Sequence, residues 1–210
     1  MIKGIIFDCD GTLVDSELLC NRALVMMLNQ YGIREDEHDL MKRFRGGKLA
    51  EILSALKERH QVQFNEQFVD EYRAQVDALF VDHLQPIDGV VEVLDNLSIP
   101  FCVASNGPKA KIQRALSLTG LSQYFDNCVF SSYEIGSWKP DPTLFLHASD
   151  AMNVNPEECL VVEDSEAGIL AANRAGMQAC LFDVSGDLEV DPACQYQRIR
   201  TMQELAALLA

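Results

Sequence analysis

Five short, continuously apolar runs recur along the sequence, and segments with helical periodicity stand between most of them. The runs are residues 2–8, 100–105, 127–132, 159–164 and 178–184. Apolar runs without polar alternation are typical of strands buried on both faces, as in a parallel sheet. Helical periodicity covers residues 89–97, 109–118, 142–152 and 165–175. This alternation predicts an α/β fold with a doubly wound parallel sheet.

One region departs from this alternation, because between residues 15 and 84 we find helical patterns and no strand signal. Apolar residues recur at helical spacing over residues 17–32, 49–60 and 65–80. We therefore predict a core domain made of residues 1–14 and 85–210, with an all-helical cap domain of residues 15–84 inserted after the first strand. An insertion there stands above the carboxyl edge of the sheet, where open α/β sheets bind ligands. We expect the cap to act as a lid.

Two carboxylates follow the first apolar run directly, in the stretch IIFDCDGTLVDS. Asp8 and Asp10 are two residues apart, so in extended backbone their side chains point to the same side. Like charges this close raise each other's pKa unless a cation lies between them. Mg²⁺ suits this place because it prefers oxygen ligands and favours one or two carboxylates together with phosphate and water.

An acid pair beside Mg²⁺ is suited to phosphoryl transfer. One carboxylate can attack phosphorus and form an aspartyl-phosphate, and the other can protonate the leaving alkoxide and later deprotonate water. Gly11 permits a sharp turn and a close approach of phosphate. A calcium-binding EF-hand loop starting at Asp8 is excluded, because its sixth and twelfth positions hold Leu13 and Leu19 instead of Gly and Glu. A plain Asp-Gly turn with solvated carboxylates stays open.

Three further stretches place polar residues at or after predicted strand ends. In SNGP, Ser105 and Asn106 can bind phosphate oxygens, although ordinary turn chemistry is an alternative. In WKPDP, Lys139 can supply a positive charge, although a solvated loop lysine is commoner. In VVEDSEAG, Glu163 and Asp164 can bind the metal, or Asp164 or Ser165 can cap the next helix. Because all these stretches lie at the same predicted sheet edge, we favour a shared site.

The ordered set FDCDGTLVDS, SNGP, WKPDP and VVEDSEAG resembles the four motifs of the haloacid dehalogenase-like (HAD) hydrolase superfamily. The resemblance covers nearly the whole chain, and the first motif is highly specific. It implies a Rossmann-like core with a small helical cap. Within the superfamily, SNGP, WKPDP and AMNVN are similar to the β-phosphoglucomutase-like subgroup, especially its bacterial sugar-phosphate phosphatases.

The resemblance implies a role for each matching residue. Asp8 is similar to the nucleophile and Asp10 to the general acid and base. By motif position, the implied metal ligands are Asp8, the main-chain carbonyl of Asp10, and Asp164 with Glu163 beside it. Lys139 matches the catalytic, charge-balancing lysine, and the phosphate-binding set is Gly11, Ser105, Asn106 and Lys139.

The implied activity is Mg²⁺-dependent hydrolysis of a small phosphomonoester, such as a sugar phosphate or a phosphorylated sugar acid like 6-phosphogluconate, through an aspartyl-phosphate. Asp10 favours a phosphatase or mutase over a dehalogenase, because halide leaves without a proton. A β-phosphoglucomutase-type transfer is an alternative with the same motifs. Less favoured are a phosphonate hydrolase, in which Lys48 would form a Schiff base, and a non-enzymatic receiver domain, which needs neither a proton donor nor a lid.

The formal net charge of −15 argues against nucleic acid and anionic membranes as partners. An anionic substrate therefore needs local cations. Within the predicted cap, RFRGGKLAEI places Arg43, Arg45 and Lys48 close together, and we expect them to contact the substrate. A solvated basic helix end is the alternative. A Walker A loop is excluded because its first Gly and its Ser or Thr are missing.

Neither a signal peptide nor a membrane-spanning run is evident. The seven cysteines form no CxxC pair, and most suit the role of small core residues in a reducing compartment. We therefore expect a cytoplasmic protein, a monomer or weak homodimer, whose partner is a small-molecule phosphate ester.

Overall fold

The computed structural model describes residues 1–125 and 128–209, and the chain divides into two compact units. The core unit comprises Met1–Val14 and Pro86–Ala210, and the helical unit comprises Asp15–Gln85. The helical unit is inserted after the first strand, in the segment for which we predict a cap. Its action as a lid stays a prediction.

The core unit contains a six-stranded parallel sheet with the strand order β3-β2-β1-β4-β5-β6. In chain order the strands are β1 Gly4–Phe7, β2 Phe101–Ser105, β3 Val129–Ser131, β4 Cys159–Glu163, β5 Gln178–Phe182 and β6 Gln197–Ile199. The chain order reverses at the central pair, where β1 adjoins both β2 and β4. Ligands of doubly wound sheets bind at such a switch point, outside the carboxyl ends of the strands. The predicted fold class is confirmed.

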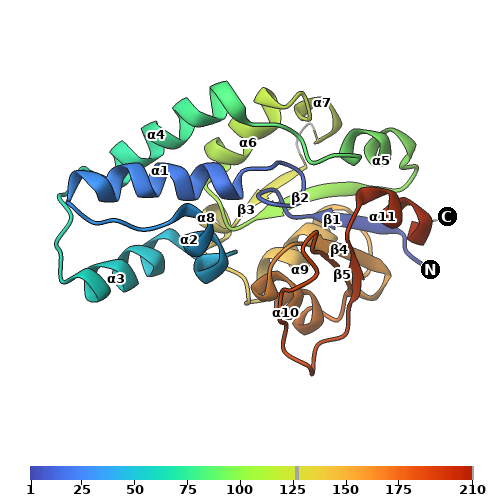
Figure 1. Cartoon of the computed structure of the whole chain (residues 1–210). Helices are drawn as coiled ribbons and strands as arrows, with labels where there is room; N and C mark the ends of the chain where they lie inside the picture. Colours follow the sequence, from blue (N-terminus) through green and yellow to red (C-terminus); the bar gives the residue numbers. More distant parts are fainter. Residues whose placement is uncertain (126–127, 210) are drawn as a thin grey trace. The chain divides into compact units, whose positions relative to one another are not determined.

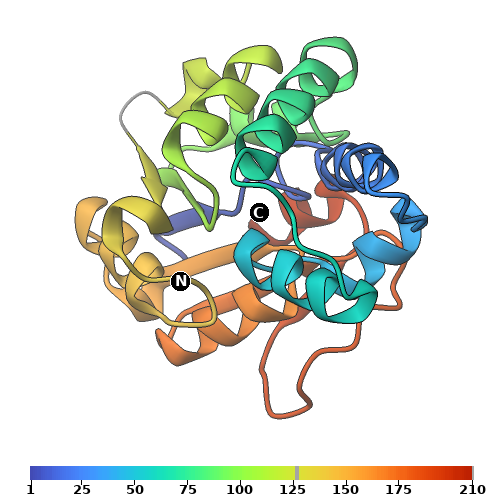
Figure 2. The ribbon, with the colours of Figure 1, turned by 90° about the vertical axis from the view of Figure 1, so that its left-hand side faces the viewer.

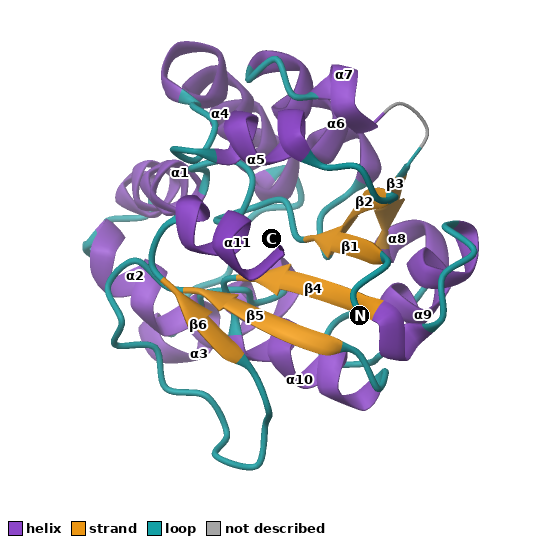
Figure 3. Ribbon diagram, turned by 90° about the vertical axis from the view of Figure 1, so that its right-hand side faces the viewer, coloured by secondary structure: helices purple, strands orange, loops and turns teal. Residues whose placement is uncertain are grey.

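Helices cover both faces of this sheet (Figure 3). On one face lie α5 Val90–Asn96, α6 Lys109–Leu118, α7 Ser122–Phe125 and α11 Met202–Leu209. On the other face lie α9 Thr143–Ala151 and α10 Glu166–Arg174, while α8 Ser132–Ile135 directly follows β3 and the 3₁₀ turn η1 Pro156–Glu158 precedes β4. Side chains alternate along β1, so Ile5 and Phe7 point to one face of the sheet and Ile6 points to the other. Because both faces carry apolar side chains, both need a covering layer of helices.

Packing on each face follows from these directions. Ile6 is buried in a cluster with Leu144 of α9 and Ile169 of α10. On the opposite face, Phe7 makes edge contacts with Phe101 and Phe125, with ring centroids 6.4 and 6.5 Å apart. Two buried layers therefore hold β1 rigidly, and β1 is the strand that ends at Asp8.

The helical unit consists of α1 Glu17–Gln30, α2 Glu37–Phe44, α3 Leu49–His60 and α4 Phe68–His83 (Figure 1). Helix α1 packs against both α2 and α4, and Figure 2 shows α1 in blue beside α4 in green. The apolar cluster of this unit includes Leu24, Leu28, Leu40 and Leu56. Three of these helices match the predicted helical stretches.

Several elements were not predicted. Helix α2 is short and largely polar, with Leu40 as its one buried residue. The Asp36 side chain caps it by accepting from the amides of His38 and Asp39. Strand β6 is a short edge strand with polar Gln197 and Arg198, and α11 follows it. In the predicted strand 127–132, residue 127 lies outside the described residues.

Within residues 1–125 and 128–209, helices long and apolar enough to cross a membrane are absent. All seven cysteines are free thiols, and burial raises the pKa of Cys9 and Cys102, which is consistent with unreactive core residues.

Candidate active site

A buried lysine joins two carboxylates at the switch point of the sheet. Nζ of Lys139 lies 2.6 Å from Oδ1 of Asp8 and 2.7 Å from Oε1 of Glu163. It also donates to the carbonyl of Ala104 at 2.8 Å and lies over the ring of Phe145. Asp8 follows β1 and Glu163 ends β4, so the pairing of adjacent strands brings the carboxylates together, and the loop after α8 brings the lysine.

The charges of this network are only partly balanced. Burial is the largest cause that raises the pKa of Asp8 well above its ordinary value; Glu163 and Asp164 add to the rise, and Lys139 offsets part of it. For Lys139, burial lowers the pKa, but attraction to Asp8 and Glu163 outweighs burial and raises it. The lysine therefore stays protonated. A further cation beside Asp8 would lower the pKa of this carboxyl and favour its ionised form.

The acids Asp8, Glu163 and Asp164 form a cluster that fits such a cation. Each offers a carboxylate oxygen, these oxygens lie within 4.8 Å of one another, and all three residues are buried. Glu163 is already engaged on both oxygens, because Oε2 accepts from the amide and hydroxyl of Ser165 at 2.9 and 2.8 Å. Ser165 also caps α10 by accepting from the amide of Gly168. Helix capping and a carboxylate cluster suited to a cation therefore coexist in this motif.

The SNGP loop follows β2 and is held by a second network. The side-chain oxygen of Asn106 accepts from the Ser132 hydroxyl at 2.9 Å and from the Lys139 amide at 3.0 Å. A main-chain N–H is always a donor, so this contact fixes which end of the Asn106 amide is the oxygen. The NH₂ group is left to donate elsewhere. Ser105 accepts from the amide of Gly107 and keeps its own O–H to donate.

Asp10 lies in the tight turn after β1, where Gly11 has a positive φ of 77° that other residues rarely adopt. Its carboxylate is held by Lys111, whose Nζ lies 2.9 Å from Oδ1 and 2.8 Å from Oδ2. Sequence reasoning missed Lys111. One signal was available, because Lys109 and Lys111 occupy the first turn of α6, where the helix dipole disfavours cations.

The structure brings together the predicted core residues, but it does not test the predicted cap cations as substrate contacts. Arg43 is paired within the helical unit, with its guanidinium 3.4 Å from Oε2 of Glu35 and over the ring of Phe44. Arg45 ends α2 and Lys48 precedes α3. Trp138, which directly precedes Lys139, packs edge-on against Tyr133.

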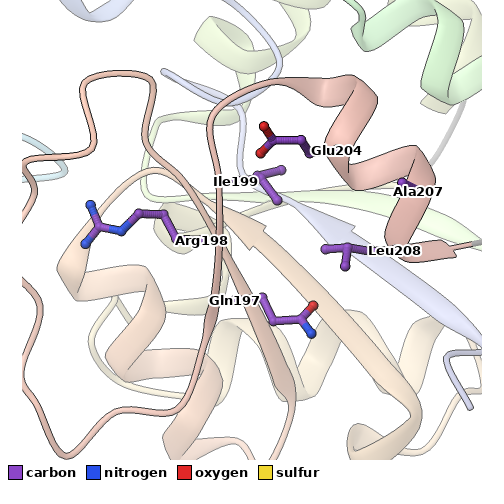
Figure 4. A pocket seen from close by; sticks show the side chains of 6 residues that line it. All are labelled: Gln197, Arg198, Ile199, Glu204, Ala207 and Leu208. Carbon is purple, nitrogen blue, oxygen red and sulfur yellow. The ribbon is translucent and has the colours of Figure 1, made fainter.

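A separate open hollow lies between the edge strand β6 and helix α11 (Figure 4). It is lined by Gln197, Arg198, Ile199, Glu204, Ala207 and Leu208. The Arg198 guanidinium donates to Asp183 and to the carbonyl of Leu188, and these contacts stabilise the loop after β5. We assign no function to this hollow.

Comparisons with known proteins agree with the motifs. A family model for haloacid dehalogenase-like hydrolases matches residues 2–176. The 6-phosphogluconate phosphatase of Escherichia coli is 43% identical over 182 residues, which cover 86% of this chain and 82% of that protein. The validoxylamine A 7'-phosphate phosphatase of Streptomyces hygroscopicus is 33% identical over 196 residues, 90% of this chain and 89% of that protein. A haloacid dehalogenase-like protein of unknown function from Agrobacterium tumefaciens has a similar structure, with a TM-score of 0.85, 30% identity, and coverage of 100% and 98%.

Proposed function

This chain belongs to the haloacid dehalogenase-like hydrolase family and is a phosphoric monoester hydrolase, and from that premise we propose that it hydrolyses a small phosphorylated sugar or sugar acid through an aspartyl-phosphate on Asp8. The observation that supports this most directly is the buried Asp8–Lys139–Glu163 network at the switch point. It holds a carboxylate nucleophile beside a fixed positive charge.

In the first step, an oxygen of Asp8 attacks phosphorus and the bond from phosphorus to the ester oxygen breaks. Asp10 gives its proton to the departing alkoxide. The Asn106 NH₂ and Ser105 O–H donate to the non-bridging phosphoryl oxygens, and Lys139 stabilises their charge. These donors are fixed in advance by the networks around them, so little reorganisation is needed as charge develops.

In the second step, Asp10 takes a proton from water as the water oxygen bonds to phosphorus. The bond between Asp8 and phosphorus breaks, which releases phosphate and restores the Asp8 carboxylate. One residue thus acts as acid and then as base, and the enzyme returns to its starting protonation state.

We propose that Asp8, Asp164 and the main-chain carbonyl of Asp10 hold a Mg²⁺ ion. When bound, this ion would supply positive charge against the phosphoryl group and the nucleophile. Glu163 has both oxygens engaged by Lys139 and Ser165. We therefore assign to Glu163 the positioning of Lys139 rather than a direct place in the metal site.

We also propose a class of substrate. Identity of 43% to a phosphatase named for 6-phosphogluconate supports a phosphorylated sugar acid as the first substrate to test. We further propose that the helical unit closes over the ester, with Arg43, Arg45 and Lys48 as the cations facing its anionic groups. In that case Arg45→Met and Lys48→Met lower kcat/KM for sugar acid phosphates more than for neutral sugar phosphates.

The test is phosphate release in the presence of Mg²⁺ from a panel of 6-phosphogluconate, 2-deoxyglucose 6-phosphate and β-glucose 1-phosphate, with NMR of the products. Free phosphate supports hydrolysis, and an isomerised sugar phosphate identifies a mutase instead. Asp8→Asn should lose all measurable release. Release by Asp8→Asn at the rate of the unaltered enzyme, or no release from any ester, would overturn the proposal.

A further inference from the structure

We propose that Lys111 is a positioning residue for the Asp10 carboxyl. This inference rests on the proposed function, in which Asp10 is the general acid and base. One ammonium group holds both oxygens of the carboxylate, at 2.9 and 2.8 Å. The two residues are 101 positions apart in sequence, so the contact is made by the fold and not by local chain geometry.

The place of Lys111 in α6 opposes the local preference of a helix. The N-terminus of a helix carries partial positive charge and favours acidic residues, yet the first turn of α6 contains no acidic residue. Lys109, two residues earlier, turns away to Glu134 at 3.0 Å in an exposed pair. Lys111 instead meets the Asp10 carboxylate. A residue that breaks a local rule at a predicted site is a candidate for a functional role.

Folding stability alone gives little reason for this contact. The side chains of Lys111 and Asp10 are 30% and 21% exposed, and partly exposed ion pairs contribute little to folding stability. Fixing a lysine side chain also costs rotamer entropy. The clearer consequence is a fixed direction for the carboxyl. Catalytic groups gain much of their effect from orientation of this kind.

The direction is toward the phosphate-binding loop. A β-carbon placed on Gly107 would lie 3.7 Å from Oδ2 of Asp10 and 3.5 Å from Oγ of Ser105, so the carboxylate and the hydroxyl flank the same glycine. In the proposed reaction, the ester oxygen sits between the phosphoryl group and the proton donor. Lys111 therefore holds Asp10 beside the place where that oxygen must leave.

The contact is compatible with both steps of the reaction. In the first step, protonated Asp10 keeps its carbonyl oxygen on Lys111 while its O–H gives a proton to the alkoxide. In the second step, one carboxylate oxygen stays on Lys111 while the other accepts a proton from water. Lys111 keeps its own protons throughout.

The test compares two esters that differ in their need for a proton donor. An alkyl ester such as a sugar phosphate has a poor leaving group, while p-nitrophenyl phosphate has a good one. The parameter kcat/KM reports the steps up to departure of the alcohol, where Asp10 acts as the acid. Because general acid catalysis contributes about 10²–10⁴-fold, we expect Lys111→Met to lower kcat/KM for the sugar phosphate by about 10–100-fold and for the aryl ester by less than about 3-fold.

Lys111→Arg should recover part of the lost activity, because a guanidinium binds a carboxylate through two N–H groups. Lys109→Met removes the same charge two residues away and should match the unaltered enzyme with both esters. Melting temperatures of all variants show whether each is folded.

An equal loss with both esters, an equal loss in Lys109→Met, or no loss in Lys111→Met would overturn the inference while leaving the proposed function intact. Absence of phosphate release from either ester by the unaltered enzyme would instead overturn the proposed function, and this inference with it.

Discussion

Asp8 is a buried carboxylate whose charged form costs folding free energy. Burial and the neighbouring acids raise its pKa above the ordinary 3.8. A carboxyl with a raised pKa in the folded state binds its proton more tightly there than in the unfolded chain. Without added metal, the contribution of Asp8 to stability therefore falls as pH rises above about 3.8. Catalytic sites commonly store instability in this way.

From this follows the first prediction, that Asp8→Asn is inactive yet more stable than the unaltered protein at neutral pH without Mg²⁺. We expect a gain of about 0.5–2 kcal/mol in the free energy of unfolding. The amide oxygen of Asn can still accept from Lys139, which also keeps Glu163, so the lysine is not stranded. Denaturant unfolding at pH 4 and pH 7 measures this. A stability difference between the two proteins that does not grow with pH would contradict the assigned cause.

At this scale, the residues that motifs mark could be predicted, and those that only the fold brings in could not. Asp8, Asp10 and Asp164 lie at or just after strand ends, and Lys139 lies in the loop after α8, all in recognisable sequence stretches. Lys111 lies on a helix. Its role depends on a carboxylate 101 residues earlier in the chain, and no spacing rule connects the two.

At the scale of elements, α10 approaches β4 so closely that a glycine is required. A β-carbon on Gly168 would overlap the Cδ and Oε1 atoms of Glu163. Glu163 cannot move aside easily, because it is buried and held by Lys139 and Ser165. Alanine would be the better helix former here, but the Glu163 side chain occupies the space that a β-carbon at position 168 would need.

We therefore predict that Gly168→Ala destabilises the protein by about 1–3 kcal/mol through overpacking, although alanine raises helix propensity by about 1 kcal/mol. It should also lower kcat, because Glu163 and hence Lys139 are displaced. A double-mutant cycle with Glu163→Ala tests the cause. If the side chain of Glu163 is the obstacle, the stability cost of Gly168→Ala disappears in that background, and persistence of the full cost would refute this explanation.

Within the helical unit, Glu35 links α2 to α3. It accepts from His60 at 2.7 Å and lies 3.4 and 3.2 Å from the guanidinium groups of Arg43 and Arg59. Burial raises the pKa of Glu35, but the hydrogen bonds from His60 and Arg43 outweigh burial and lower it below the ordinary 4.5. The contribution of this carboxylate to stability is therefore present above that value and is lost as pH falls below it.

The corresponding prediction is that Glu35→Gln lowers the melting temperature near pH 7 and has a smaller effect near pH 3, because the contribution of this carboxylate to stability decreases as pH falls below 4.5. Loss of a partly buried charge network typically costs about 1–3 kcal/mol. Thermal unfolding followed by circular dichroism at both pH values measures this. Glu51→Gln, at an exposed position on α3, serves as the matched control and should leave the melting temperature close to that of the unaltered protein.

Helices and strands with many buried apolar residues lie where the sequence predicted them, whereas short elements with few buried residues were missed. Five strands and most long helices lie in the predicted segments. Helix α2 and strand β6 were missed because one buries a single residue and the other is a polar edge strand of three residues. Their positions are set by the tertiary neighbours that they cover.

For the whole molecule, the central question is how a chain of net charge −15 holds an anionic ester. The core unit gathers three of its acids, Asp8, Glu163 and Asp164, in one buried cluster with a single lysine bridging two of them. Buried acids this close together cost folding free energy, because their charges repel one another. Binding of the cation to the folded chain alone would then return the lost free energy.

We accordingly predict that Mg²⁺ raises the melting temperature in the absence of any substrate. At a free concentration of about 100 times Kd, the expected stabilisation is about 2.7 kcal/mol. Asp164→Asn should remove most of this shift, and Glu163→Gln should retain more of it if Glu163 positions Lys139 rather than binding the ion. NaCl at matched ionic strength separates binding from general screening of the −15 charge, because screening depends on ionic strength and not on ion identity. A melting temperature that rises equally with NaCl, or equally in Asp164→Asn, would mean that the acid cluster is not a magnesium site.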